Sequence, residues 1–105
     1  MTKRPLLHPA AEVEYLDAIR HYEAIRRGLG AEFDRAAAGA VEDIDWNPEA
    51  WPPFPGWDRL PLVRSRNVDV FPYRVVYFVR GDEVILVAFA HQSREPGYWA
   101  QRIDS

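Results

Sequence analysis

The spacing of apolar residues predicts two helices in the first half of the chain. The first begins at about Pro9, because proline is tolerated at the first position of a helix, and it ends near Gly28 and Gly30. Acidic and basic residues fall mostly on its other faces. The pattern therefore predicts an amphipathic helix of about five turns. Its apolar positions recur at three-residue spacing and are Val13, Leu16, Ile19, Tyr22 and Ile25.

The second helix is predicted from about Ala31 to the Asn47-Pro48 pair, because a residue before proline avoids the helical region. Its apolar stripe follows a four-three-four spacing, which keeps side chains on one face. Only two or three residues separate the two helices, so they are expected to form an antiparallel helical hairpin. The stripe consists of Phe33, Ala37, Ala40 and Ile44.

The second half of the chain reads as a loop followed by strands. Residues 47–58 contain four prolines and a glycine, which forbid regular structure. Three strand-like runs follow at 60–70, 73–79 and 84–90, and Gly81-Asp82 forms the turn between the last two. Residues 3–7 resemble a further short strand, which Pro5 confines to a sheet edge.

A two-residue turn at Gly81-Asp82 fixes which side chains share a face of the last hairpin. Arg80 then faces Glu83, and the register runs to Arg74 opposite Phe89. One face is wholly apolar and is expected to receive the helices: Tyr73, Val75, Tyr77, Val79, Val84, Leu86, Ala88 and Ala90. The other face is apolar only in its middle: Arg74, Val76, Phe78, Arg80, Glu83, Ile85, Val87, Phe89 and His91.

This second face needs a cover, either from the C-terminal tail or from another protein. The candidate partner-binding residues are Phe78, Ile85, Val87, Phe89 and Trp99. The predicted fold class is therefore α+β. An N-terminal edge strand and a helical hairpin pack on an antiparallel sheet of three to four strands, followed by a short C-terminal tail.

Composition narrows the possible functions. The 105 residues suit one domain, and the absence of cysteine excludes disulfides and thiolate metal sites. No apolar run suggests a signal peptide or a membrane span, so a cytoplasmic protein without membrane contact is expected. The three histidines share no metal-ligand spacing, and neither a metal nor another cofactor is expected. The net charge of −3 lacks the basic balance of a typical nucleic-acid binder.

Three stretches carry a resemblance to a known family. Residues 8–12 (His-Pro-Ala-Ala-Glu) open a long helix, residues 71–77 (Phe-Pro-Tyr-Arg-Val-Val-Tyr) form a strand, and residues 90–99 (Ala-His-Gln-Ser-Arg-Glu-Pro-Gly-Tyr-Trp) form the tail. Their order and spacing resemble the ParE/RelE toxin superfamily, and the tail resembles its plasmid-stabilisation branch. The resemblance implies a growth-inhibiting toxin that a cognate antitoxin neutralises. RelE-like members cut messenger RNA on the ribosome, whereas ParE-like members inhibit DNA gyrase and are not enzymes.

The resemblance also implies site residues. Arg74 matches the family's strand arginine, Arg94 and Tyr98 match the tail of the ribonuclease branch more loosely, and Arg64 and Arg66 lie where that branch carries basic residues. RNA cleavage without a metal needs a base, an acid and a cation on the phosphate.

His91 joins this set because imidazole titrates near neutral pH and because the predicted register places it diagonally from Arg74. Other roles remain open for these residues. Arg74 can pair with a carboxylate, His91 can bond to backbone, and Tyr98 with Trp99 can pack the tail. Arg64 and Arg66 can be solvated charges on an edge strand.

An alternative from another class is a non-catalytic scaffold or accessory binding module. Its contact patch would be Trp51, Phe54 and Trp57, although the same three aromatic residues can simply pin their loop to the domain.

Overall fold

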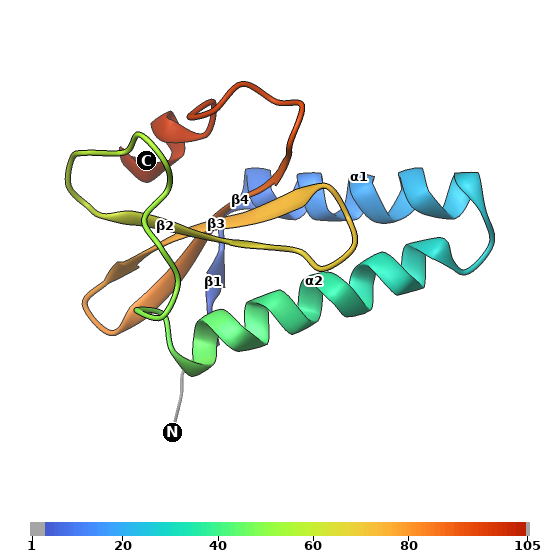
Figure 1. The fold of residues 1–105 in the computed structure, drawn as a ribbon, viewed down its shortest axis with the longest axis horizontal. Helices are drawn as coiled ribbons and strands as arrows, with labels where there is room; N and C mark the ends of the chain where they lie inside the picture. Colours follow the sequence, from blue (N-terminus) through green and yellow to red (C-terminus); the bar gives the residue numbers. More distant parts are fainter. Residues whose placement is uncertain (1–3, 105) are drawn as a thin grey trace.

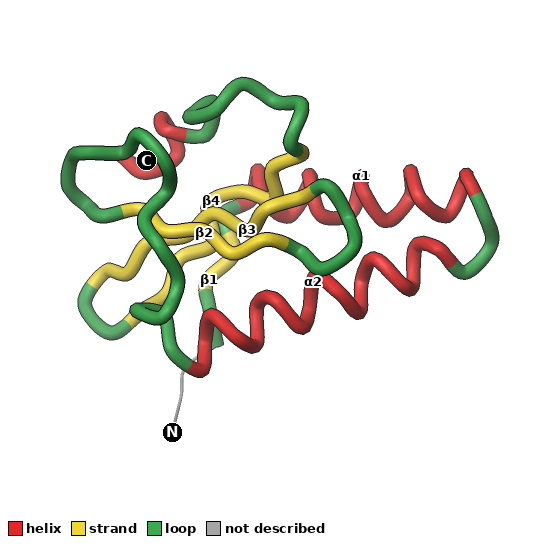
Figure 2. The backbone as a smooth tube through the Cα atoms, in the orientation of Figure 1, coloured by secondary structure: helices red, strands yellow, loops and turns green. Residues whose placement is uncertain are grey.

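The computed structural model describes residues 4–104 and contains a helical hairpin, a four-stranded sheet and a short tail helix (Figures 1 and 2). In chain order the elements are β1 (Leu6–Leu7), α1 (Pro9–Ile25), α2 (Leu29–Trp46), β2 (Val63–Asn67), β3 (Tyr73–Arg80), β4 (Glu83–His91) and the 3-10 helix η1 (Ala100–Asp104). The strand order in the sheet is β1-β4-β3-β2. The α+β class is as predicted, and the three longer strands are antiparallel, but β1 joins β4 in parallel, so the sheet is mixed.

Local signals set the limits of the two helices. His8 caps α1, because its Nδ1 accepts the N–H of Ala10 at 3.1 Å, and Pro9 occupies the first helical position. Gly30 lets the helices approach closely, since a Cβ there would lie 2.7 Å from the carbonyl oxygen of Ile19. The predicted end of the second helix is confirmed, with Asn47 as its cap.

The α2 stripe is confirmed, because all four predicted residues are fully buried. The α1 stripe is wrong for three of its five residues. Val13 and Ile25 are 58% and 62% exposed, and Leu16 is 38% exposed. The buried side of α1 instead carries Ala11 and Ala18, with Tyr15, Ile19 and Tyr22 packed against the core.

A β-bulge in β4 changes the predicted faces of the hairpin. The predicted register holds from Arg80 opposite Glu83 to Tyr77 opposite Leu86. It shifts between Val76 and Tyr77, so that Val76 pairs with Ala88 and Tyr73 pairs with His91. Beyond the bulge, each β4 residue changes to the other face of the sheet. Phe89 therefore packs on the helix side, and Ala88 and Ala90 pack on the tail side.

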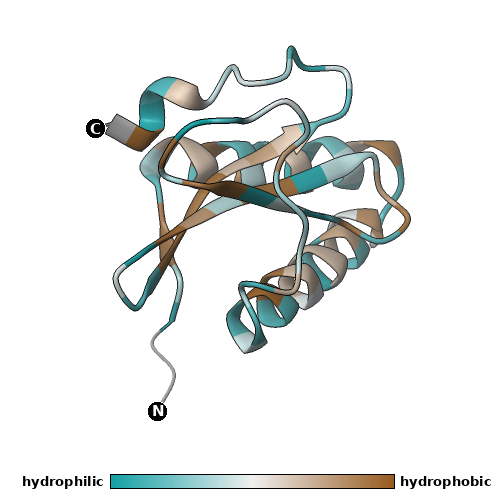
Figure 3. Ribbon diagram, turned by 60° about the vertical axis from the view of Figure 1, so that its left-hand side comes forward, coloured by the Kyte–Doolittle hydropathy of each residue, from teal (hydrophilic) through white to brown (hydrophobic). Residues whose placement is uncertain are grey.

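The tail and the proline-rich loop cover the second face of the sheet. Trp99 is 1% exposed, and its ring centroid lies 4.9 Å from that of Phe54 and 5.3 Å from that of Trp57. Figure 1 shows this loop running from the end of α2 toward the tail, where the two segments lie next to each other. Figure 3 shows hydrophobic stretches, drawn in brown, along the strands of the sheet. The sequence allowed either the C-terminal tail or another protein to cover this face, and in the structure the tail covers it.

The two edge strands of the sheet are shorter than predicted. The edge strand is confirmed at Leu6–Leu7, while Lys3 of the predicted strand lies outside the described residues. The run predicted at 60–70 is a strand only over Val63–Asn67. Within residues 4–104, none of the helices has the length and apolarity needed to cross a membrane.

Candidate functional site

The predicted site residues meet at one end of the sheet. Arg74, His91, Arg94 and Tyr98 all line a hollow of about 260 Å³, together with aromatic walls from Phe54 and Trp99. The prediction that Arg74 and His91 lie diagonally on one face is wrong, because the bulge places His91 opposite Tyr73 and pairs Arg74 with Ala90. The two side chains nevertheless line the same hollow, since it opens where β4 ends and the tail begins.

Arg74 is held by neutral groups. Its Nε donates to Oδ1 of Asn67 at 3.2 Å, and its guanidinium carbon lies 5.3 Å from the ring centroid of Phe54. The alternative prediction, a carboxylate partner for Arg74, is not found among residues 4–104. The Arg74 side chain is thus oriented by an amide and an aromatic face, and the residue lines the hollow.

His91 has one ring nitrogen committed to the backbone. Nδ1 accepts the N–H of Ser93 at 2.9 Å, which is the structural role that the sequence left open. The imidazole packs edge-on against the ring of Tyr73, with 5.0 Å between the centroids. His91 also lines a second hollow of about 250 Å³, which Asp17 and His21 of α1 border from the other side.

The tail tyrosine is an anchor. Tyr98 donates its hydroxyl hydrogen to Oε2 of Glu14 at 2.6 Å, and Arg94 stacks on its ring with its guanidinium carbon 3.9 Å from the centroid. Burial, followed by the hydrogen bond to Glu14, raises the pKa of the Tyr98 hydroxyl well above its ordinary value. The phenol therefore stays protonated and bound to the carboxylate.

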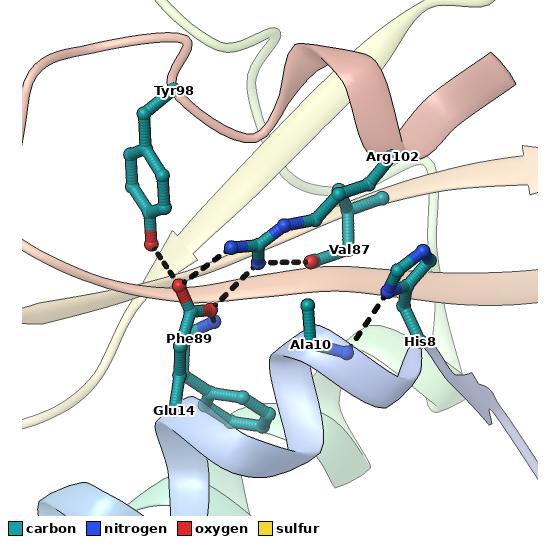
Figure 4. A network of polar contacts seen from close by, with 7 residues as sticks. All are labelled: His8, Ala10, Glu14, Val87, Phe89, Tyr98 and Arg102. Carbon is teal, nitrogen blue, oxygen red and sulfur yellow. Dashed lines mark hydrogen bonds and ion pairs between the residues drawn. The ribbon is translucent and has the colours of Figure 1, made fainter. Parts of the chain in front are cut away.

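Glu14 is the centre of a polar network that joins α1, β4 and the tail (Figure 4). Arg102 donates to both of its carboxylate oxygens, at 2.9 and 3.0 Å, and also donates to the carbonyl of Val87 at 3.0 Å. The backbone N–H of Phe89 donates to Oε1 of Glu14 at 3.1 Å. Burial opposes the charge on Arg102, but its contacts with Glu14 outweigh burial and raise its pKa.

Sequence reasoning missed both Glu14 and Arg102. They are separated by 88 positions, so no local pattern links them. One signal was present, because Glu14 lies three residues after Ala11 and four before Ala18. That spacing places a carboxylate on the buried side of α1, where a charge requires a partner.

The two arginines of β2 lie outside this hollow. Arg64 donates to the carbonyl of Trp51 at 2.5 Å. Arg66 pairs with Asp43 at 2.6 Å and with Asp69 at 3.2 Å. Arg66 borders a separate hollow of about 490 Å³ that reaches Arg74 from the other side. Both residues thus tie β2 to its neighbouring segments, and their RNA-binding role stays a prediction.

The predicted partner-binding residues are packed within the chain. Phe78, Val87 and Trp99 are buried in the core on the tail side, and Ile85 packs against them. Phe89 is buried on the helix side, because the bulge reverses its face. These side chains present no open docking surface while the tail is in place. The part of the chain that the structure describes also holds no cluster of three or more metal-ligating side chains.

A model of the ParE toxin of the type II toxin–antitoxin system parDE matches residues 6–96. The chain belongs to the ParE toxin family. This match confirms the resemblance drawn from the helix entry, the strand motif and the tail, and it gives the chain the toxin role in such a system.

The ParE-like fold recurs in a solved structure. A chain from the chromosomal ParDE toxin–antitoxin system of P. aeruginosa superposes with a TM-score of 0.68 at 14% sequence identity. The match covers 84% of this chain and 96% of that chain. At this identity the likeness shows a shared fold. No curated protein sequence matches the ParE-family chain described here.

Proposed function

We propose that this ParE-family protein inhibits growth by binding its target, DNA gyrase, and that a cognate antitoxin holds it inactive. The proposal rests on one observation at the site, the hydrogen bond from Tyr98 to Glu14. It fastens the tail tyrosine to α1 as part of the fold. The gyrase target follows from the resemblance to ParE-like members of the superfamily.

Messenger RNA cleavage makes different demands on these residues. It needs a base at the 2′-hydroxyl, a cation at the phosphate and an acid at the leaving oxygen. The Tyr98 hydroxyl is engaged by a carboxylate, and burial raises its pKa, so proton exchange with a substrate is unfavourable. Nδ1 of His91 is occupied by Ser93. These commitments support a protein-binding toxin over a nuclease.

Brief induction in growing cells tests the target. A gyrase inhibitor causes filamentation and DNA damage signalling, and purified toxin inhibits supercoiling by gyrase. In this case His91→Ala retains toxicity, whereas changes in residues 94–99 reduce it. Rapid translation arrest without damage signalling contradicts the proposal.

A second candidate, ribosome-dependent cleavage of messenger RNA, is favoured by the shared hollow of Arg74, His91 and Arg94. It predicts that Arg74→Ala and His91→Ala each abolish toxicity while folding and antitoxin binding persist, since removing one positioned catalytic group typically costs about a hundredfold or more in rate. Full toxicity of both variants, with unchanged circular dichroism, removes this candidate.

The antitoxin is proposed to be encoded by the neighbouring reading frame. Co-expression followed by pull-down tests this partnership. The scaffold alternative would use Trp51, Phe54 and Trp57 as its contact patch, but Phe54 and Trp57 pack on the buried Trp99. Substitution of these aromatic residues is therefore expected to lower stability. Loss of partner binding with unchanged stability favours the scaffold instead.

A further inference from the structure

We propose that the hollow between Arg74 and Arg94 is a receptor for a side-chain carboxylate of the antitoxin. This inference rests on the proposed function, because it assigns to that partner a particular chemical group and a particular place. It follows from three features of the hollow: its two arginines have no ion-pair partner among residues 4–104, their guanidinium groups are held by neighbouring side chains, and the residues that line the hollow suit a protein side chain.

Several arginines among residues 4–104 already form an ion pair with a carboxylate of the same chain. Arg20, Arg26, Arg66 and Arg102 each form an ion pair within the chain. Arg74 and Arg94 form none among residues 4–104, and both border the same hollow. The hollow also contains Glu95, so its formal charge is positive by one unit when His91 is neutral. A ligand with one negative charge matches this excess.

Both guanidinium groups are held in place before any ligand binds. Asn67 and Phe54 orient Arg74, and the ring of Tyr98 supports Arg94. The Tyr98 ring is itself fixed by Glu14. Because these contacts restrict the long side chains in the free protein, less conformational entropy is lost on binding, and two charged donors can meet one carboxylate.

The surroundings favour a protein carboxylate over the phosphates of RNA. The walls are apolar and aromatic, with Phe54, Pro96 and Trp99, and the volume of about 260 Å³ suits one side chain. Glu95 lies within the hollow, and Asp17 lines the adjoining hollow next to Arg94. These carboxylates leave a small positive excess that suits the single charge of one Asp or Glu side chain better than the row of phosphates of a polynucleotide.

The direct test uses nuclear magnetic resonance on the full chain and needs no antitoxin. The Nε–H signals of Arg74 and Arg94 are followed while a capped Trp-Glu dipeptide or a uridine hexanucleotide is added. A saturable shift of both signals with the dipeptide supports the receptor when the Arg94 shift is lost in Arg74→Gln and both shifts are kept in Arg35→Gln. Arg35 is an exposed arginine of α2 outside the hollow. Binding of the hexanucleotide alone, or no shift with either ligand, overturns it.

The second test measures antitoxin affinity and separates the two proposals. Arg74→Gln and Arg94→Gln are each expected to weaken binding of the neighbouring-frame product about tenfold or more, with Arg35→Gln unchanged. If wild-type toxin binds that product and both hollow variants bind it equally well, the receptor is wrong and the proposed function survives. If the wild type binds no such product but the dipeptide still titrates both arginines, the proposed partner fails and the carboxylate site stands.

Discussion

The hydroxyl of Tyr98 donates a 2.6 Å hydrogen bond to Glu14, a residue 84 positions earlier in the chain. The same carboxylate accepts from Arg102 and from the backbone of Phe89. The strand β1 pairs with β4 only as far as Leu86, so the edge of β4 beyond it needs other partners. Glu14 and Arg102 supply them, and the tail is thereby fastened to the bulged edge of the sheet.

Replacing Glu14 with glutamine is expected to lower the free energy of unfolding by about 2 kcal/mol or more. The Glu14 and Arg102 side chains are only 15% and 19% exposed, so Arg102 would lose its counter-charge in a largely dry environment. Urea unfolding gives the stability. Hydrogen exchange at the Phe89 amide reports its hydrogen bond to residue 14, which is expected to weaken and so to exchange faster, because glutamine offers one neutral oxygen in place of a carboxylate.

Glu42→Gln is the matched control for this prediction. Glu42 is an exposed residue of α2 that forms no ion pair with another side chain of residues 4–104, and its change is expected to stay within about 0.5 kcal/mol of the wild type. Equal stability losses in Glu14→Gln and Glu42→Gln would show that the network does not anchor the tail.

Stability is expected to fall above pH 10, and Tyr98→Phe is expected to make that fall less steep. Burial and the bond to Glu14 raise the folded-state pKa of Tyr98 above the ordinary value of 10.0. Below pH 10 both states keep the phenol proton; above it the unfolded state loses its proton first, so unfolding becomes more favourable. Burial also raises the pKa of Tyr77, to about 12, and this contribution remains in the variant. Urea unfolding at pH 8 to 11 measures the two slopes, and identical slopes contradict the prediction.

The two helix stripes show when spacing alone predicts burial. The α2 residues Phe33 and Ile44 lie within a four-three-four pattern, which stays on one face of a helix with 3.6 residues per turn. The α1 stripe used steps of three, each of which falls about 60° short of a full turn. Over several steps it rotates from the exposed Val13 to the half-buried Ile19 and Tyr22. The sequence therefore predicted the existence of α1 but not its buried face.

The sequence predicted which residues line the candidate site, but it did not predict their relative positions. Turn chemistry at Gly81-Asp82 predicts the hairpin register up to Leu86, but no glycine or proline marks the bulge at Val87. Arg74 and His91 still line the same hollow. The start of β3 pairs with the end of β4, and the tail begins directly after β4. Glu14 could not be assigned to it, since its partners depend on the docking of α1 against a tail more than 80 residues away.

Val70→Gly is expected to stabilise the protein by about 1 kcal/mol. Val70 lies between β2 and β3 with a φ of 74°, a left-handed conformation that disfavours a β-branched residue. Its side chain is 96% exposed, so truncation removes little buried surface. Thermal unfolding compares this variant with Leu60→Gly, another exposed loop residue at 89%, for which no gain is expected. A similar gain in both variants would indicate that strain at Val70 is not the cause.

Two tryptophans at opposite extremes of burial give the last prediction. Trp99 is 1% exposed and packs on Phe54 and Trp57, so Trp99→Ala is expected to cost about 3–5 kcal/mol of stability. Trp46, at the end of α2, is 88% exposed, and Trp46→Ala is expected to change stability by no more than about 0.5 kcal/mol. Both variants lose the same side chain, so the difference in their urea midpoints isolates the effect of burial. If Trp99→Ala unfolds like the wild type but no longer binds the antitoxin, the tail is a partner-binding element rather than the cover of the sheet.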